Sequence, residues 1–181
     1  MHKKQLTEQF IVWDKIPNIL TLDNDAFKSD ALKNYAFKNR RSEDEFHYKY
    51  NYYSLGHHQH LDWLLSYILD HFFVEYKRSL SLFERSVIIQ NKGDSINTHH
   101  HLDEYNIKKS PDMSCLYCVD IGEKVSYIIF EYEGGRRRHG KWKIPMEKGK
   151  LIIFNSELPH HLTQNENEDP IVNISLQFQL I

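Results

Sequence analysis

The residues most able to do chemistry lie in the segment 93–103, which reads Gly-Asp-Ser-Ile-Asn-Thr-His-His-His-Leu-Asp. In an extended chain alternate side chains share a face, so His99, His101 and Asp103 would project to one side. Two imidazoles and one carboxylate can bind a ferrous ion on one face and leave its other positions open. A Leu-Pro-His-His segment later in the chain offers His160 as a further ligand. The sequence therefore predicts an iron site made by His101, Asp103 and His160.

The three adjacent histidines leave a second choice of ligands open. If His99 is the first ligand, it pairs with His101 and the site contains no carboxylate. We favour His101 with Asp103 because a carboxylate offsets the charge of the ferrous ion. In that arrangement His99 and His100 would orient the ligands from outside the coordination sphere.

The composition describes a chain of 181 residues, the size of one domain. Its 23 Lys and Arg against 25 Asp and Glu give a formal net charge of -2, so no global field favours nucleic acid or a membrane surface. Neither a secretory leader nor an apolar run of about 18 residues is visible. We therefore expect a cytoplasmic protein that binds neither nucleic acid nor membrane. Cys115 and Cys118 are expected to be core residues of a buried strand.

The elements that must position the candidate ligands change in kind along the chain. Apolar residues spaced by three and four predict a helix over 60–76, and an N-cap cluster at 23–25 predicts a shorter one over 26–37. From residue 79 onward, short apolar runs separated by turn residues predict strands instead. These strands are expected over 80–90, 115–120, 127–132, 142–144, 151–154, 162–164 and 171–180.

Helices followed by strands predict an α+β fold. The expected architecture is a double-stranded β-helix, or jelly roll, of about eight antiparallel strands braced by N-terminal helices. Residues 1–78 would form the helical support region and residues 79–181 the jelly-roll core, within a single domain.

Four segments carry a family resemblance that covers about residues 79–181. Residues 91–103 contain Gly-Asp followed by His-x-Asp, and residues 116–120 form an apolar strand that ends in Asp. Residues 130–135 form a strand that ends in two glycines, and residues 149–160 run from Gly-x-Leu to Leu-Pro-His. In this order the segments resemble the prolyl-hydroxylase-like members of the 2-oxoglutarate/Fe(II) dioxygenases.

The resemblance implies an activity and two cofactors, Fe(II) and 2-oxoglutarate. Iron would bind 2-oxoglutarate bidentately, and the keto acid would lose carbon dioxide as dioxygen splits. The product would be a hydroxylated C–H bond in a peptide side chain or a small metabolite. The metal would carry the chemistry, while the protein would fix the geometry.

One position departs from the family pattern, in which an arginine past the distal histidine holds the far carboxylate of 2-oxoglutarate. Here Asn173 stands where that arginine is expected, Ser175 keeps the family's serine, and no Lys or Arg follows His161. The resemblance implies Asn173 and Ser175 as cosubstrate-binding candidates, and Tyr117 is a further hydroxyl donor. Arg85, in phase with Val87 and Ile89, is a candidate to replace the missing arginine. Further basic candidates are Lys141, Lys143 and the arginine turn 136–138.

The missing arginine keeps two other classes of function open. The first is a jelly-roll binding or structural module without turnover. The second is a cupin-like metalloenzyme that uses three histidines and no keto acid.

Overall fold

The computed structural model describes residues 2–6, 9–16, 23–41, 52–55, 61–103, 105–133 and 139–181. The helices of this part are α1 (Asn24–Arg41), α2 (Asp62–Tyr76) and a short 3-10 helix (Ile107–Lys109). The strands are β1 (His2–Leu6), β2 (Gln9–Lys15), β3 (Tyr52–Ser54), β4 (Leu80–Gln90), β5 (Ile96–His99), β6 (Met113–Asp120), β7 (Tyr127–Glu133), β8 (His139–Pro145), β9 (Lys150–Asn155), β10 (His160–Leu162) and β11 (Ile171–Leu180).

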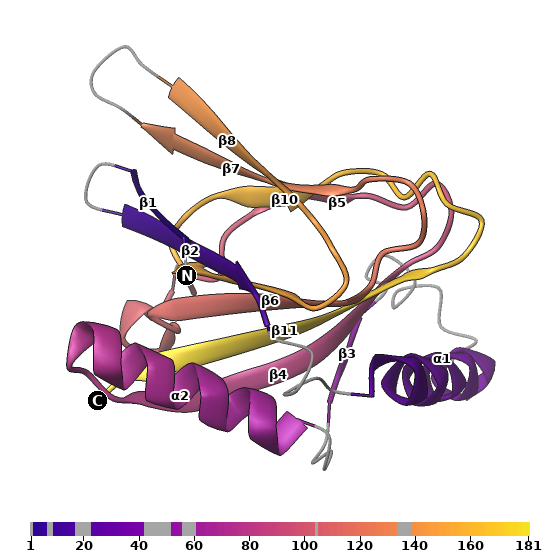
Figure 1. The fold of residues 1–181 in the computed structure, drawn as a ribbon, viewed down its shortest axis with the longest axis horizontal. Helices are drawn as coiled ribbons and strands as arrows, with labels where there is room; N and C mark the ends of the chain where they lie inside the picture. Colours follow the sequence, from indigo (N-terminus) through magenta and orange to yellow (C-terminus); the bar gives the residue numbers. More distant parts are fainter. Residues whose placement is uncertain are drawn as a thin grey trace.

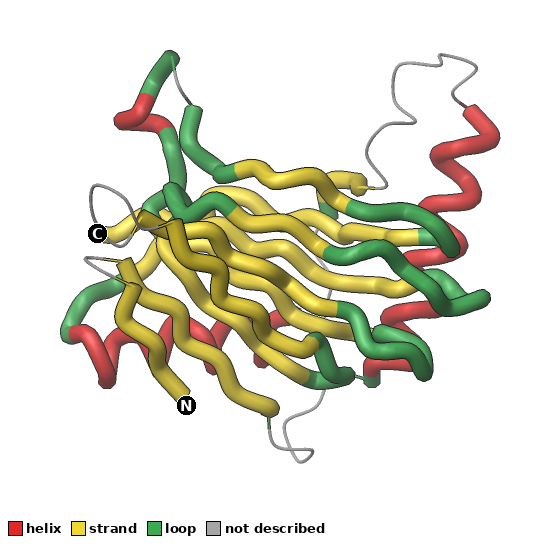
Figure 2. Tube along the Cα trace, turned by 90° about the horizontal axis from the view of Figure 1, so that it is seen from above, coloured by secondary structure: helices red, strands yellow, loops and turns green. Residues whose placement is uncertain are grey.

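Two antiparallel sheets pack face to face, with the helices on the far side of the larger one (Figure 1). The larger sheet has the order β1-β2-β9-β6-β11-β4-β3, and the smaller sheet has the order β5-β10-β7-β8. Seen from above, the strands of the two sheets lie roughly along one common axis (Figure 2). Strands β4 to β11 all lie within the segment expected to form the jelly roll. The predicted α+β jelly-roll class is confirmed.

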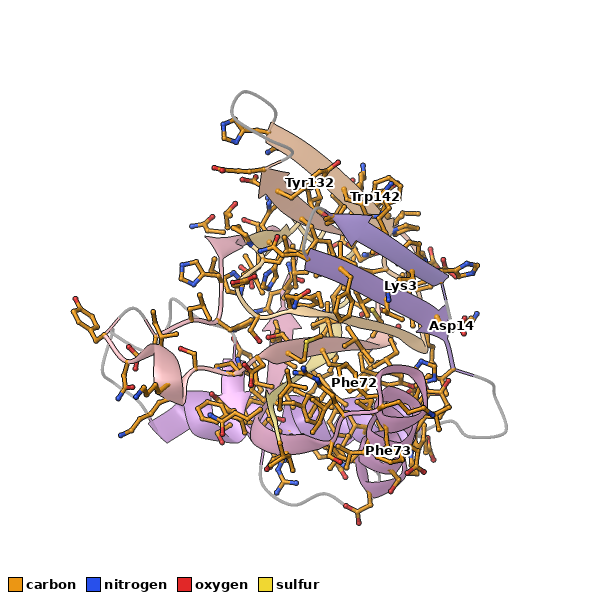
Figure 3. All side chains as sticks on the ribbon, turned by 90° about the vertical axis from the view of Figure 1, so that its left-hand side faces the viewer. Lys3, Asp14, Phe72, Phe73, Tyr132 and Trp142 are labelled. Atoms are coloured by element: carbon orange, nitrogen blue, oxygen red, sulfur yellow. The ribbon has the colours of Figure 1, made fainter. Side chains whose placement is uncertain are left out.

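The first 78 residues contribute strands as well as helices. Strand β2 pairs with β9, with Ile11 opposite Phe154, and β1 pairs with β2. Leu6 and Ile11 are buried between the two sheets. Trp13 contacts Trp142 of β8 at 6.5 Å between ring centroids, and Trp142 is labelled in Figure 3. This hairpin therefore extends the larger sheet beside β9.

The larger sheet is buried on both faces, so the molecule has two cores. Along β11 the even-numbered residues 172–178 are all apolar and pack toward the helices. Ile171, on the other face, belongs to the core between the sheets. Because side chains alternate along a strand, Asn173, Ser175 and Gln177 share that inter-sheet face. A row of polar residues is thereby placed inside the barrel.

The two helices are fastened to the larger sheet by burial and by polar contacts. Helix α2 buries apolar residues spaced by three and four, including Phe72, whereas the adjacent Phe73 is exposed (Figure 3). Helix α1 is joined to β6 by the ion pair between Lys28 and Asp120, at 2.6 Å. Neither helix in the described residues is long and apolar enough to cross a lipid bilayer.

A buried asparagine holds the connection between β10 and β11 against the loop that precedes β5. The Asn165 side chain donates to the carbonyls of Gln90 at 2.8 Å and Asp169 at 3.0 Å. Its Oδ1 accepts from the backbone and side-chain N–H groups of Asn167. Its backbone N–H donates to the Asp94 carbonyl at 2.9 Å. These bonds tie the segment after β10 to the end of β4 and to the loop that precedes β5.

We expect Asn165→Ala to lower the free energy of unfolding by about 2 kcal/mol, because it leaves buried backbone carbonyls and the Asn167 amide without partners. Urea denaturation measures this change. The neighbouring Glu166 is exposed, so Glu166→Ala is the matched control and should change stability by less than about 0.5 kcal/mol. Equal effects of the two substitutions would contradict a bracing role for Asn165.

Candidate metal centre

Three histidines from two neighbouring strands converge on one point. His99 ends β5 and lies opposite His160 of β10 in the antiparallel register. His101 follows two residues after β5, where its backbone N–H donates to the Ser156 carbonyl at 2.9 Å. One ring nitrogen from each histidine lies within 4.8 Å of the other two. That separation allows all three nitrogens to bind a single cation.

Aromatic side chains form the apolar wall of this cluster. The His160 ring is buried, with Phe154 at 4.6 Å and Phe130 at 5.9 Å between ring centroids. Phe130 lies directly opposite His160 on β7, and Phe154 projects from β9 of the other sheet. The packing of the two sheets therefore fixes the ring of His160 and limits water on its apolar side.

Backbone carbonyls set the tautomer of two of the rings. Nδ1 of His99 lies 2.9 Å from the Asn97 carbonyl, and Nδ1 of His160 lies 2.9 Å from the Leu158 carbonyl. A carbonyl oxygen only accepts hydrogen bonds, so in each neutral ring Nδ1 carries the proton. Nε2 is then left with a free lone pair, as a metal ligand requires.

Burial keeps His101 and His160 uncharged at neutral pH. Desolvation, with the neighbouring histidines as lesser causes, lowers the pKa of His101 to about 4. The same causes lower the pKa of His160 well below its usual value. Both rings are therefore neutral at pH 7, which is the form that binds a metal ion without first losing a proton.

Asp103 lies outside this group, which corrects the expected ligand set. Its exposed carboxylate accepts hydrogen bonds from the backbone N–H groups of Tyr105 at 2.9 Å and Asn106 at 3.2 Å. The expectation assumed an extended chain through Asp103, but β5 ends at His99 and the chain then turns. The structure brings His101 and His160 together, as expected, with His99 in the place given to Asp103.

Two of the expected cosubstrate-binding residues face the core under the helices, whereas the histidines lie on the side of the core between the two sheets. Tyr117 is buried on the helix side, where its hydroxyl donates to Asn24 Oδ1 at 3.1 Å. Arg85 lies opposite Leu176, which faces the helices, and its Nε donates to the Leu55 carbonyl at 2.8 Å. Both residues are inward-facing, but the larger sheet has two inward faces. This corrects their assignment to the metal side.

The other two expected residues, Asn173 and Ser175, do share the face that holds the histidines. Asn173 is fully buried, and among the described residues neither its Nδ2 nor its Oδ1 has a hydrogen-bond partner. A buried amide without partners costs about 1–3 kcal/mol. Two residues farther along the strand, Ser175 is also buried. The Asn173 amide is thus a buried polar group that the described residues leave without a hydrogen bond.

A buried lysine that the sequence did not single out as a candidate lies at the start of β9, near Cys118 of β6. Lys150 opens β9 and is 7% exposed, and its Nζ donates to the Pro145 carbonyl at 2.7 Å and to Glu147 Oε1 at 2.5 Å. Its charge lies close enough to Cys118, the β6 neighbour of Asn173, to lower the pKa of that thiol, although burial raises it overall to about 12. In the sequence Lys150 reads only as a residue after a glycine turn.

The remaining basic candidates are engaged away from the histidines or lie outside the described residues. Lys141 pairs with Glu131 at 2.8 Å, and Nζ of Lys143 lies 3.5 Å above the Tyr127 ring. The arginine turn 136–138 is outside the described residues. His161 faces away from the cluster, with Nδ1 3.8 Å from Glu131 Oε1.

A half-open groove of about 680 Å³ lies beside Pro159, the residue before His160. Most of its lining residues are of polar or charged type, and both signs of charge are present: Gln9, Glu131, Tyr132, Glu133, His139, Gly140, Lys141, Glu157 and Pro159. The groove would accept a polar molecule or a peptide segment next to the strand that carries His160.

Comparisons with known proteins place the fold. No family model matches the sequence, and no curated protein matches it. A Pseudomonas putida prolyl-4-hydroxylase matches with a TM-score of 0.61 at 12% identity, covering 93% of this chain and 87% of that one. The viral collagen prolyl hydroxylase of Paramecium Bursaria Chlorella virus-1, solved as a 2OG complex, matches with a TM-score of 0.63 at 13% identity, covering 92% and 94%.

A third solved structure extends the comparison beyond prolyl hydroxylases. The non-heme alpha ketoglutarate dependent carbocyclase SnoK from nogalamycin biosynthesis matches with a TM-score of 0.65 at 12% identity, covering 92% of this chain and 78% of that one. At such low sequence identity these matches show the fold alone. The chain therefore has the jelly-roll fold that these 2-oxoglutarate-dependent enzymes and prolyl hydroxylases share.

Proposed function

We propose that this protein is an Fe(II)- and 2-oxoglutarate-dependent oxygenase whose iron is held by His99, His101 and His160. The observation that carries the proposal is the convergence of three ring nitrogens within 4.8 Å in a fold shared with 2-oxoglutarate-dependent enzymes. When bound, the iron and the keto acid would activate dioxygen for attack on a C–H bond. The protein's own part is to hold, orient and partly desolvate that centre.

Three imidazoles, unlike two imidazoles and a carboxylate, add no negative charge to the site. The centre would then keep the full charge of the ferrous ion. An anionic bidentate ligand such as a keto acid is favoured at such a centre because it supplies the missing negative charge in a desolvated place. The three-histidine set is thus compatible with 2-oxoglutarate as a cosubstrate.

The far carboxylate of the keto acid would lie against Asn173 and Ser175. The orphaned Nδ2 of Asn173 offers a hydrogen-bond donor, and the buried hydroxyl of Ser175 offers another. Lys150 would contribute a buried positive charge from β9. We propose this polar group as the substitute for the family's arginine.

The substrate would be a small molecule or a peptide side chain with polar character. This is supported by the half-open groove beside Pro159, whose lining includes three glutamates and one lysine. A hydroxylated product of such a substrate is the reaction class that we assign.

The test is anaerobic reconstitution with Fe(II) followed by titration with 2-oxoglutarate. We expect a visible absorption band to appear and saturate as the keto acid binds. In Asn173→Leu the band should require at least about 10-fold more keto acid, which corresponds to about 1.4 kcal/mol of binding free energy. The stability of the metal-free variant should be unchanged or higher, because leucine removes an unsatisfied buried amide.

A second function is favoured by one observation: among the described residues no carboxylate joins the three histidines, and Asn173 stands where the family has arginine. It is a three-histidine metalloenzyme that uses no keto acid. Bound iron without any band at saturating 2-oxoglutarate would support this alternative over our proposal. A protein that binds no iron would contradict both.

A further inference from the structure

Gln177 joins the last strand to the histidine cluster. Its Nε2 lies 2.9 Å from Nδ1 of His101, a contact between residues 76 positions apart in the sequence. The pairing of β11 with β4 shifts register between Gln177 and Phe178, which is the mark of a β-bulge. The extra residue of this bulge is Phe83 on β4, and it lies opposite the step from Gln177 to Phe178.

His101 differs from the other two histidines in the kind of partner that its outer nitrogen has. His99 and His160 each contact the carbonyl two residues earlier, and a carbonyl can only accept. The partner of His101 is a side-chain amide, which can accept through Oε1 or donate through Nε2. A half-turn about the last side-chain bond of Gln177 exchanges these two atoms without moving the backbone.

The orientation of this amide decides which nitrogen of His101 carries the proton. In the structure the Gln177 NH₂ group faces Nδ1, so Nδ1 accepts and the neutral ring carries its proton on Nε2. A ring in that state has no lone pair on Nε2 for a cation. Binding through Nε2 requires the proton on Nδ1, where Oε1 of Gln177 would accept it.

We propose that Gln177 is a positioning residue that sets the tautomer of His101, and that its amide rotates when a metal ion binds. The inference rests on the proposed function only in placing a cation among the three histidines. The amide thus accommodates both states: it satisfies His101 in the metal-free protein and holds the ring in its binding form afterward.

Substitutions at Gln177 separate this role from simple packing. Gln177→Leu removes the acceptor, and loss of such an outer partner typically weakens metal binding about 10- to 100-fold. Gln177→Glu keeps an acceptor that cannot donate, so it should bind metal at least as tightly as the natural protein. Gln179→Leu is the matched control, because Gln179 lies two residues farther on the same strand and is also half-buried.

The experiment measures Co(II) binding by competition with a chelator, together with the visible spectrum of bound Co(II). We expect weaker binding and an altered spectrum in Gln177→Leu, recovery in Gln177→Glu, and no change in Gln179→Leu. Binding by Gln177→Leu within two-fold of the natural protein, with the same spectrum, would overturn the proposal. Thermal unfolding of the metal-free variants checks that each one folds.

Imidazole ¹⁵N NMR of the diamagnetic Zn(II) form tests the rotation directly. The proton of His101 should lie on Nε2 without metal and on Nδ1 with Zn(II). A ring protonated on Nδ1 in both states would overturn the rotation. If the natural protein bound neither metal, this inference and the proposed function would fail together. Normal metal results with no effect of 2-oxoglutarate would count against the proposed function alone.

Discussion

His99→Ala is expected to weaken Fe(II) binding by more than about 100-fold, whereas Asp103→Ala should leave it within about two-fold. The reason is geometric: His99 lies in the cluster with His101 and His160, and the Asp103 carboxylate is occupied by two backbone N–H groups of the following turn. Loss of an outer partner of a ligand already costs about 10- to 100-fold in metal affinity, so loss of a ligand should cost more.

Competition with a chromogenic chelator under anaerobic conditions measures both affinities. His161→Ala is the matched control, because His161 is adjacent to His160 in the sequence but lies on the other face, near Thr98 and Glu131. It should bind Fe(II) like the natural protein. A large loss of Fe(II) affinity in Asp103→Ala, together with normal affinity in His99→Ala, would instead support the ligand set of His101, Asp103 and His160.

The metal-free protein is expected to lose about 3 kcal/mol of stability between pH 7 and pH 4 from His101 alone. Burial lowers the pKa of His101 to about 4, whereas the unfolded chain keeps a value near 6.5. Between these values the unfolded state binds a proton that the folded state does not, so unfolding becomes more favourable as the pH falls. His160 shifts in the same direction and adds to the loss.

Urea denaturation at closely spaced pH values measures this effect. The range from pH 6.5 to 5 isolates the histidines, because the resolved shifts of Asp120, Glu131, Glu147 and Glu168 all lower their pKa values, so these carboxylates titrate at lower pH. His101→Gln should reduce the slope in that range. A free energy of unfolding that did not change over this range would mean that both rings accept protons in the folded protein as readily as in the unfolded chain.

Most of the architecture could be read from the sequence because apolar periodicity reports burial. The strands expected over 80–90 and 171–180 are β4 and β11, and the helix expected over 60–76 is α2. Turn residues marked the boundaries between them. The pairing of β2 with β9 could not be predicted from the sequence, because it joins segments far apart in the chain.

The candidate site was only partly legible, because burial does not say which face of a sheet a residue occupies. Arg85 is in phase with Val87 and Ile89, as the sequence indicated, but that face packs on the helices. Asp103 required β5 to continue past His99, and local pattern does not determine where a strand ends in a polar segment. Gln177 has no sequence signal, because its role depends on a contact with a ring 76 positions away.

Strand β5 is four residues long and, in the described part of the smaller sheet, lies at its edge beside β10 alone. A cation shared by His99 and His160 would tie this edge strand to β10 and close a loop of about 60 residues between the two histidines. Separation of β5 from β10 and dissociation of the ion would then be one event, so the ion would stay bound for as long as these two short strands remain paired.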